Sequence, residues 1–266
     1  MNAKNGSVKL GNTEMDYAVF GRGEKALIML PGLGDGLRTV KGTALTMALT
    51  YGKFGKKYRV YVFSRKNDLP DRYGTRDMAA DQTAAMEALG IERAHILGVS
   101  QGGMIAEHLA IDHPERVGKL ILTVSTAKVS PMTKDVLLRW IGLMEQGRCG
   151  EIMVDTAERS YSGAYLKKYR FMYPLLRRMG KPRDPRRFLI QAKACLEHDA
   201  SSRLDEITAP TLIIGGDRDQ IVGPEAAQQL HEAIPGSKCV IYEGLGHAAY
   251  EEAKNFQSLV LSFLEK

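Results

Sequence analysis

A short apolar segment, a serine between glycines and a second apolar pattern follow one another between residues 94 and 113. Residues 94–99 are apolar and partly β-branched, which predicts a strand buried on both faces. Residues 103–113 carry Met104, Ile105, His108 and Leu109 at helical spacing, and Pro114 ends that pattern. Between the two lies Gly98-Val99-Ser100-Gln101-Gly102. The chain is therefore predicted to contain a tight strand-to-helix turn in a parallel sheet.

The serine of that turn is a candidate nucleophile. In a G-x-S-x-G turn the serine adopts a strained backbone conformation and its hydroxyl is pushed out above the sheet. Gly98 and Gly102 remove side chains where the strand and the helix come closest. Ser100 is the residue that this pattern selects. A serine that merely caps the following helix is the alternative interpretation.

A nucleophilic serine needs a base, and the base needs an orienting acid. Residues 211–215 read as a buried strand and residues 238–242 as a further strand, and polar residues follow each of them. The first is followed by Asp217 and Asp219, and the second by His247. In open α/β sheets the functional residues lie at the carboxyl ends of the strands, so these residues are candidates for the acid and the base. Other histidines fall within the predicted strand or helices: His95, His108, His113 and His231.

With these motifs the chain resembles, over essentially its whole length, serine hydrolases of the α/β-hydrolase fold. The family's G-x-x-D-x-x-V pattern selects Asp219 as the acid, counted from Gly216 to Val222, and leaves Asp217 as the alternative. Its G-H motif matches Gly246-His247 and makes His247 the base. The resemblance implies an α/β fold with a mostly parallel central sheet, helices on both faces and an inserted helical cap.

An oxyanion hole is the remaining part that the resemblance implies, because charge on the attacked carbonyl oxygen needs prepositioned N–H donors. The backbone N–H of Gln101, directly after the nucleophile, is one expected donor. The other is the N–H of Leu33, in the glycine-rich loop that follows the predicted strand at 26–30. Pro31 stands in this loop where the family usually has His-Gly. A dinucleotide fingerprint fails here, because the third glycine of G-x-G-x-x-G would fall on Leu37.

Strand and helix patterns alternate along most of the chain and stop between about residues 125 and 204. Before this interval come an opening hairpin around Gly11-Asn12, further strands and a helix over residues 75–89. We therefore expect a core formed by residues 1–124 and 205–266, with a helical cap at 125–204.

The predicted cap is basic and rich in tyrosine. Residues 127–203 contain 16 Lys and Arg against 8 Asp and Glu, whereas the whole chain has a net charge of +6. These cations indicate either an entrance for anionic substrates or a solvated outer face. Tyr161, Tyr165, Tyr169 and Tyr173 recur every fourth residue, which predicts a stripe along one helix face. With Met172 nearby, the first three of these tyrosines line an acyl pocket or pack the cap onto the core.

Composition favours a single-chain cytoplasmic enzyme. The 266 residues, 44% of them hydrophobic, suit one large domain with an insertion. Neither a membrane-spanning run nor a secretion signal is recognised, and no nucleic-acid motif accompanies the positive charge. Cys149, Cys195 and Cys239 are widely spaced, which predicts reduced thiols. The apolar faces are all assigned to the sheet or the cap, so the sequence predicts no oligomeric state.

The expected activity is hydrolysis of a carboxylic ester of a small to medium acyl substrate. Ser100 would form an acyl-enzyme, His247 would act as the base, and Asp219 would orient His247. This mechanism requires neither a metal nor an organic cofactor, and its partner is a small acyl substrate. Similar frameworks also serve lactonases, thioesterases, acyltransferases and C–C bond hydrolases, and a non-catalytic ligand-binding protein is a further alternative.

Overall fold

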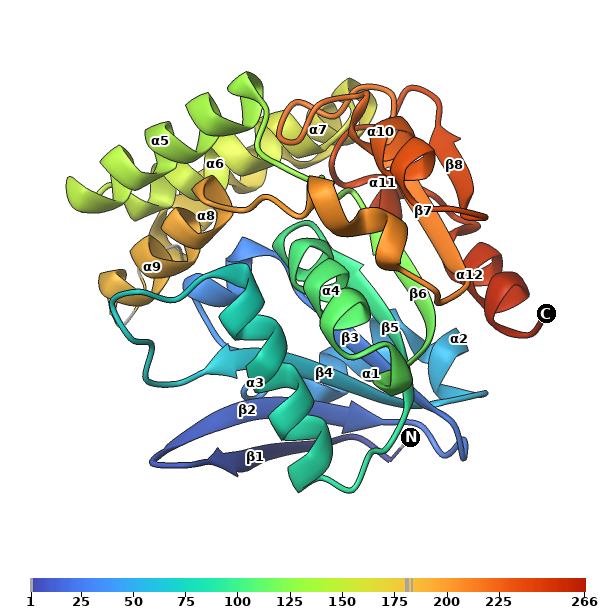
Figure 1. Ribbon diagram of the computed structural model, residues 1–266. Coiled ribbons are helices and arrows are strands. Elements are labelled where there is room, and N and C mark those ends of the chain that lie inside the picture. The colour runs from blue at the N-terminus through green and yellow to red at the C-terminus, as the bar shows by residue number, and fades with distance from the viewer. Residues whose placement is uncertain (1, 180–181, 183) are drawn as a thin grey trace.

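The computed structural model describes residues 2–179, 182 and 184–266, and a twisted, mostly parallel sheet forms their centre (Figure 1). In these residues the sheet has eight strands in the order β1-β2-β4-β3-β5-β6-β7-β8. Their bounds are β1 Lys4–Leu10, β2 Thr13–Phe20, β3 Ala26–Leu30, β4 Arg59–Lys66, β5 Ala94–Val99, β6 Val117–Thr123, β7 Thr211–Gly216 and β8 Lys238–Tyr242.

The pairing of the strands determines which loops meet. β1, β2 and β4 pair antiparallel, and every pair from β4 to β8 is parallel. In the β3–β5 pair Leu30 is opposite Gly98, so both strands end at the same edge of the sheet. The loop that follows β3 therefore lies next to the turn that contains Ser100.

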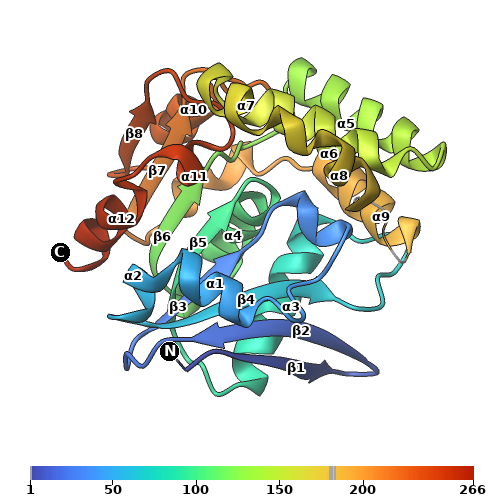
Figure 2. The same ribbon diagram turned by 180° about the vertical axis from the view of Figure 1, so that it is seen from behind.

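Helices cover both faces of the sheet, which explains why the inner strands are almost continuously apolar. The buried cluster on one face includes side chains of α3 (Thr75–Ala88), α4 (Gln101–Asp112) and α10 (Ala226–Ala233). The cluster on the other face includes side chains of α1 (Ala44–Thr50), α2 (Gly52–Gly55) and α12 (Phe256–Leu264). Figures 1 and 2 show these two groups from opposite sides. The shorter elements are η1 Leu33–Gly36, η2 Pro114–Arg116, η4 Ser201–Glu206 and α11 Ala249–Glu252.

A group of helices between β6 and β7 lies over the edge where the parallel strands end (Figures 1 and 2). These are α5 Pro131–Glu145, α6 Cys149–Ser160, α7 Gly163–Tyr169, η3 Arg170–Met172, α8 Tyr173–Met179 and α9 Pro185–Leu196. The side chains of Ser130, Ser162 and Asp184 accept hydrogen bonds from backbone N–H groups at the starts of α5, α7 and α9. Lys181 and Arg183, two of the basic residues in this interval, lie outside the described residues.

The fold class predicted from the sequence is confirmed, and two local details differ. The first strand of the hairpin begins before its apolar residues Val8 and Leu10, because its backbone pairs with β2 from Lys4 onward. The tyrosine stripe does not lie on one helix as predicted. Ser162 caps a new helix at this point, so Tyr161 ends α6, whereas Tyr165 and Tyr169 belong to α7. The bounds of the cap remain a prediction. Among the described helices, none combines the length and apolar character that crossing a membrane requires.

Candidate active site

Ser100 sits at the junction of β5 and α4 in a conformation that L-residues rarely adopt. Its φ is 55° and its ψ is −119°. Its backbone N–H donates to the Thr123 carbonyl at 2.9 Å, and its own carbonyl accepts from Gly103 at 2.8 Å. A Cβ added to Gly102 would lie 1.9 Å from the Leu30 carbonyl oxygen, so no side chain fits there. The two glycines thus allow strand and helix to approach closely enough to hold the serine in this strained turn.

His247 and Asp219 complete a chain of hydrogen bonds from Ser100. The Nε2 atom of His247 lies 2.9 Å from the Ser100 Oγ, and its Nδ1 lies 2.7 Å from Asp219 Oδ2. The other carboxylate oxygen of Asp219 accepts the backbone N–H groups of Ile221 and Val222 at 2.8 and 3.0 Å. Asp219 and His247 are 2% and 8% exposed. This arrangement allows the imidazole to take a proton from the serine while the carboxylate fixes its tautomer.

Two backbone N–H groups beside Ser100 remain available to a ligand. Gln101 is the first residue of α4 and Leu33 is the first residue of η1, and a helix provides no internal acceptor for its first N–H groups. The loop of Leu33 lies against the nucleophile, because a Cβ on Gly32 would be 3.7 Å from the Ser100 Oγ. Both N–H groups predicted for the oxyanion hole are thus on segments that adjoin the serine.

A buried arginine that no sequence motif marks links these two segments. Arg65, at the end of β4, is completely buried. Its Nη2 donates to the Pro31 carbonyl at 2.6 Å and to Gln101 Oε1 at 2.9 Å. Burial lowers the pKa of Arg65, and the nearby carboxylate of Asp35 opposes that shift. One guanidinium therefore holds the loop before Leu33 and the residue after the nucleophile in fixed positions.

The same loop is connected to the cap through Asp35. Its Oδ2 accepts Arg187 Nη2 from α9 at 2.5 Å and Gln191 Nε2 at 3.1 Å. Arg187 also donates to the Asp35 and Lys66 carbonyls at 3.1 and 2.7 Å. Nothing in the sequence separates Arg187 from its basic neighbours, because its role depends on which loop α9 packs against.

A pocket of about 690 Å³ opens between the core and the cap helices, and Ser100 and His247 lie in its wall. The wall is largely apolar and aromatic, with these described residues among its lining: Val99, Trp140, Met153, Leu166, Phe188 and Ile221. All four residues predicted for an acyl pocket also line it: Tyr161, Tyr165, Tyr169 and Met172. The site can therefore accommodate an apolar group next to the serine.

Three of those tyrosines form a ladder of adjacent rings along the cap, of which the first pair is stacked and the second is tilted by 35°. The ring centroids of Tyr161 and Tyr165 are 4.4 Å apart with an interplanar angle of 9°, and those of Tyr165 and Tyr169 are also 4.4 Å apart. The Tyr161 hydroxyl donates to Glu251, on α11 just after His247. Its pKa is raised by burial and by that carboxylate. The ladder is thus anchored beside the histidine loop.

Much of the positive charge on the described residues of the cap is paired with carboxylates, and of these carboxylates only Asp35 lines the pocket. Seven of the described arginines between residues 127 and 203 have a carboxylate within 4.0 Å: Arg139, Arg148, Arg159, Arg170, Arg186, Arg187 and Arg203. Among the described residues that line the pocket there is no Lys, and Arg38 is the only Arg. Arg38 is exposed and belongs to the core. This distribution favours a solvated outer face for the cap cations.

Comparison with known proteins assigns the chain to a family. A family model described as the alpha/beta hydrolase fold matches residues 47–148 and 154–254. The chain therefore belongs to the α/β-hydrolase fold family.

Curated relatives of the chain are hydrolases. It is 29% identical over 265 residues to 2-hydroxy-6-oxononadienedioate/2-hydroxy-6-oxononatrienedioate hydrolase 2 of Pseudomonas putida, covering 95% of this chain and 92% of the relative. It is 30% identical over 274 residues to the 2-hydroxy-6-oxononadienedioate/2-hydroxy-6-oxononatrienedioate hydrolase of Cupriavidus pinatubonensis. This match covers 97% of this chain and 93% of the relative. Hydrolase activity is thus supported, and the bond that is cleaved is a separate question.

Solved structures with the same fold include enzymes of different named activities. The enol-lactonase from Burkholderia xenovorans LB400 superposes with a TM-score of 0.85 at 21% identity, covering 98% of this chain and 100% of the other. An esterase from Exiguobacterium antarcticum gives a TM-score of 0.82 at 22% identity, covering 99% and 100%. At such identities these likenesses describe the fold alone.

Proposed function

We propose that the protein is a serine hydrolase that cleaves a carboxylic ester of a small to medium acyl substrate through an acyl-enzyme. The observation that carries this proposal is the hydrogen-bonded chain Ser100–His247–Asp219 in the wall of a largely apolar pocket. Nucleophile, base and orienting acid are within hydrogen-bond distance of one another, as acyl transfer requires.

The mechanism follows from this geometry. His247 Nε2 takes the proton of Ser100 Oγ as the oxygen attacks the ester carbonyl, and the Leu33 and Gln101 N–H groups stabilise the resulting oxyanion. Collapse of the tetrahedral intermediate breaks the bond to the alkoxy oxygen, which leaves as the alcohol with the proton from His247. Water activated by His247 then attacks the acyl-enzyme and releases the acid.

The charge of the pocket favours an ester with an uncharged acyl group. The charged or titratable side chains among its described lining are Asp35, Arg38, His247 and Glu251, apart from the tyrosines. Asp35 is held by Arg187, and Arg38 is exposed, so the only acid or base aligned with Ser100 in this set is His247. A substrate with two carboxylates would approach Glu251 with little cationic compensation, which costs binding energy.

The test is hydrolysis of p-nitrophenyl esters from acetate to decanoate by the wild type, Ser100→Ala and Ser7→Ala. Ser7 is an exposed serine on β1 and serves as the matched control. We expect activity in the wild type and in Ser7→Ala, and loss of about 10⁴-fold or more in Ser100→Ala. Equal activity in all three proteins would show that another group does the chemistry.

C–C bond cleavage is the second candidate, because two curated relatives at 29–30% identity are named 2-hydroxy-6-oxononadienedioate/2-hydroxy-6-oxononatrienedioate hydrolases. C–C bond cleavage is tested directly by incubating the protein with a 2-hydroxy-6-oxo-dienedioate and measuring the decrease in the absorbance of its dienolate. Turnover of this compound with no ester cleavage would replace the ester proposal. If the protein turns over neither substrate and Ser100 does not react with a fluorophosphonate, the protein is non-catalytic.

A further inference from the structure

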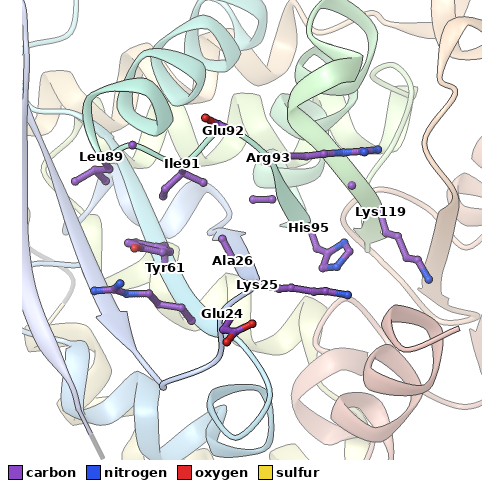
Figure 3. A pocket seen from close by; sticks show the side chains of 14 residues that line it. Glu24, Lys25, Ala26, Tyr61, Leu89, Ile91, Glu92, Arg93, His95 and Lys119 are labelled. Carbon is purple, nitrogen blue, oxygen red and sulfur yellow. The ribbon is translucent and has the colours of Figure 1, made fainter.

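A second cavity, of about 710 Å³, lies at the edge of the sheet opposite the pocket of Ser100 (Figure 3). It is formed where the parallel strands begin, with Ala26 of β3, Arg59 of β4, Ala94 of β5 and Gly118 of β6 in its wall. β5 connects the two sites, since it starts in this cavity and ends at the serine turn. At about 3.3 Å per residue the strand separates them by roughly 16 Å.

Basic side chains dominate this cavity. Lys25, Arg59, Arg93 and Lys119 line it, against the two acids Glu24 and Glu92. Among the residues that the structure describes, none of these four cations has a carboxylate within 4.0 Å. The wall therefore has an excess of positive charge that its own acids do not pair.

The hydrogen bonds that these cations make leave several donors unused. Lys119 Nζ donates to the Phe263 carbonyl at 3.0 Å, and an ammonium group has three donors. Arg93 donates through Nε and Nη2 to the Val117 carbonyl at 3.3 and 3.2 Å, which leaves Nη1 for another acceptor. These contacts also fix where the two cationic groups are held.

The pKa of His95 is affected by the charges of three of these cations. Figure 3 shows its ring on the same side of the cavity as the ends of Lys25, Arg93 and Lys119. Burial, followed by the charges of Lys119, Lys25 and Arg93 in that order, lowers the pKa of His95 to about 4. Its Nδ1 is buried without a hydrogen-bond partner among the described residues. A neutral histidine among three cations is what a site for negative charge would contain in its empty state.

From this cavity and its unpaired cations we infer a binding site for a small, multiply charged phosphate anion of the diphosphate type. Lys25, Arg59 and Arg93 are exposed, so an anion can reach them from solvent. Several unpaired cations in one wall match an anion with several charges better than a single carboxylate, and arginine binds phosphate oxygens through more than one N–H. Tyr61, Leu89 and Ile91 add an apolar part to the wall, next to the charged part. This inference does not depend on the proposed esterase activity, because the site shares no residue with the pocket of Ser100.

Isothermal titration calorimetry with sodium pyrophosphate and with ADP, at constant ionic strength, tests the inference. We expect the wild type and Ser100→Ala to bind at least one of the two with equal affinity. Lys25→Gln/Arg93→Gln should weaken that binding by about tenfold or more. Lys9→Gln/Lys134→Gln removes the same charge from two exposed lysines elsewhere and should retain the wild-type affinity. Absence of binding by the wild type, or equal weakening in both double variants, would overturn the site.

Further measurements identify which part of the ligand is bound and whether the double variant is folded. ADP binding tighter than pyrophosphate would assign the apolar wall to a nucleoside, and equal binding would assign the site to the diphosphate alone. If thermal unfolding shows that the double variant is not folded, Lys25→Gln and Arg93→Lys replace it individually. Histidine NMR gives an independent readout, because a bound anion should raise the pKa of His95 toward its ordinary value. An unchanged His95 titration at saturating ligand would contradict binding at this cavity.

Discussion

Asp217 and Asp219 are two residues apart, and their surroundings give them different roles. Asp219 contacts His247 and the N–H groups of Ile221 and Val222. Asp217 instead accepts the Gly244 N–H at 2.7 Å, in the loop that leads to the histidine. One carboxylate thus orients the imidazole, and the other holds the loop that carries it.

Asp219→Asn should lower kcat for ester hydrolysis on the order of 10⁴-fold, because an amide can favour the wrong tautomer of His247. Asp217→Asn, the matched control, should retain most of the activity. Steady-state kinetics on the preferred p-nitrophenyl ester measures both. Comparable losses in the two variants would mean that Asp219 has no special part in the reaction.

At this scale the sequence could predict only the residues whose chemistry depends on a local pattern. Ser100, Asp219 and His247 each follow a strand in a motif of fixed spacing, and the structure brings the three together. Arg65 has no such pattern. Its contacts with Pro31 and Gln101 depend on three segments that meet only after folding.

Among the elements, the ladder of tyrosines on the cap is the one most suited to setting substrate size. Tyr165 is the middle ring, stacked on Tyr161 and beside Tyr169, and all three line the pocket. The four-residue spacing predicted a stripe along one helix face, and three of the rings do lie next to one another. It did not predict that they span two helices, because the break at Ser162 arises from a cap and from Glu252, which accepts the Ser162 N–H at 2.9 Å.

Tyr165→Ala should shift the preference for acyl chain length toward longer esters, because removing a ring enlarges the pocket. The expected result is a lower KM for octanoate and decanoate esters, with acetate affected least. Phe171→Ala is the matched control: Phe171 belongs to η3, is 79% exposed and is not part of the described pocket lining. A chain-length profile that Tyr165→Ala leaves unchanged would show that the ladder only packs the cap.

In the whole molecule, the two edges of one sheet carry different chemistry. The strand ends support Ser100, Asp219 and His247 beneath the cap, whereas the strand starts form the basic cavity. The alternation of strands and helices predicted the first edge, since chemistry gathers where parallel strands end. It could not predict the second, because Lys25, Arg93 and Lys119 read as ordinary surface charges until the sheet brings them into the wall of one cavity.

The lowered pKa values of two histidines predict how the free energy of unfolding changes with pH. Burial lowers the pKa of His95 and of His108 to about 4 in the folded protein, and neighbouring cations and His198 contribute. The ordinary histidine pKa is 6.5, so between pH 6.5 and 4 the unfolded chain binds protons that the folded chain does not. The stability associated with these residues is therefore fully present above pH 6.5, decreases as the pH falls toward 4, and changes little further below it.

His108 allows this contribution to be isolated. It is 9% exposed on α4, its ring centroid is 5.3 Å from that of His198, and its Nδ1 has no partner among the described residues. Urea unfolding at pH 7 and pH 5 should show a smaller loss of unfolding free energy for His108→Leu than for the wild type, because the variant lacks one group that protonates on unfolding. Carboxylates common to both proteins cancel in this comparison. An identical loss in the two proteins would mean that His108 protonates equally readily in the folded and unfolded chains, so its burial would not contribute to acid sensitivity.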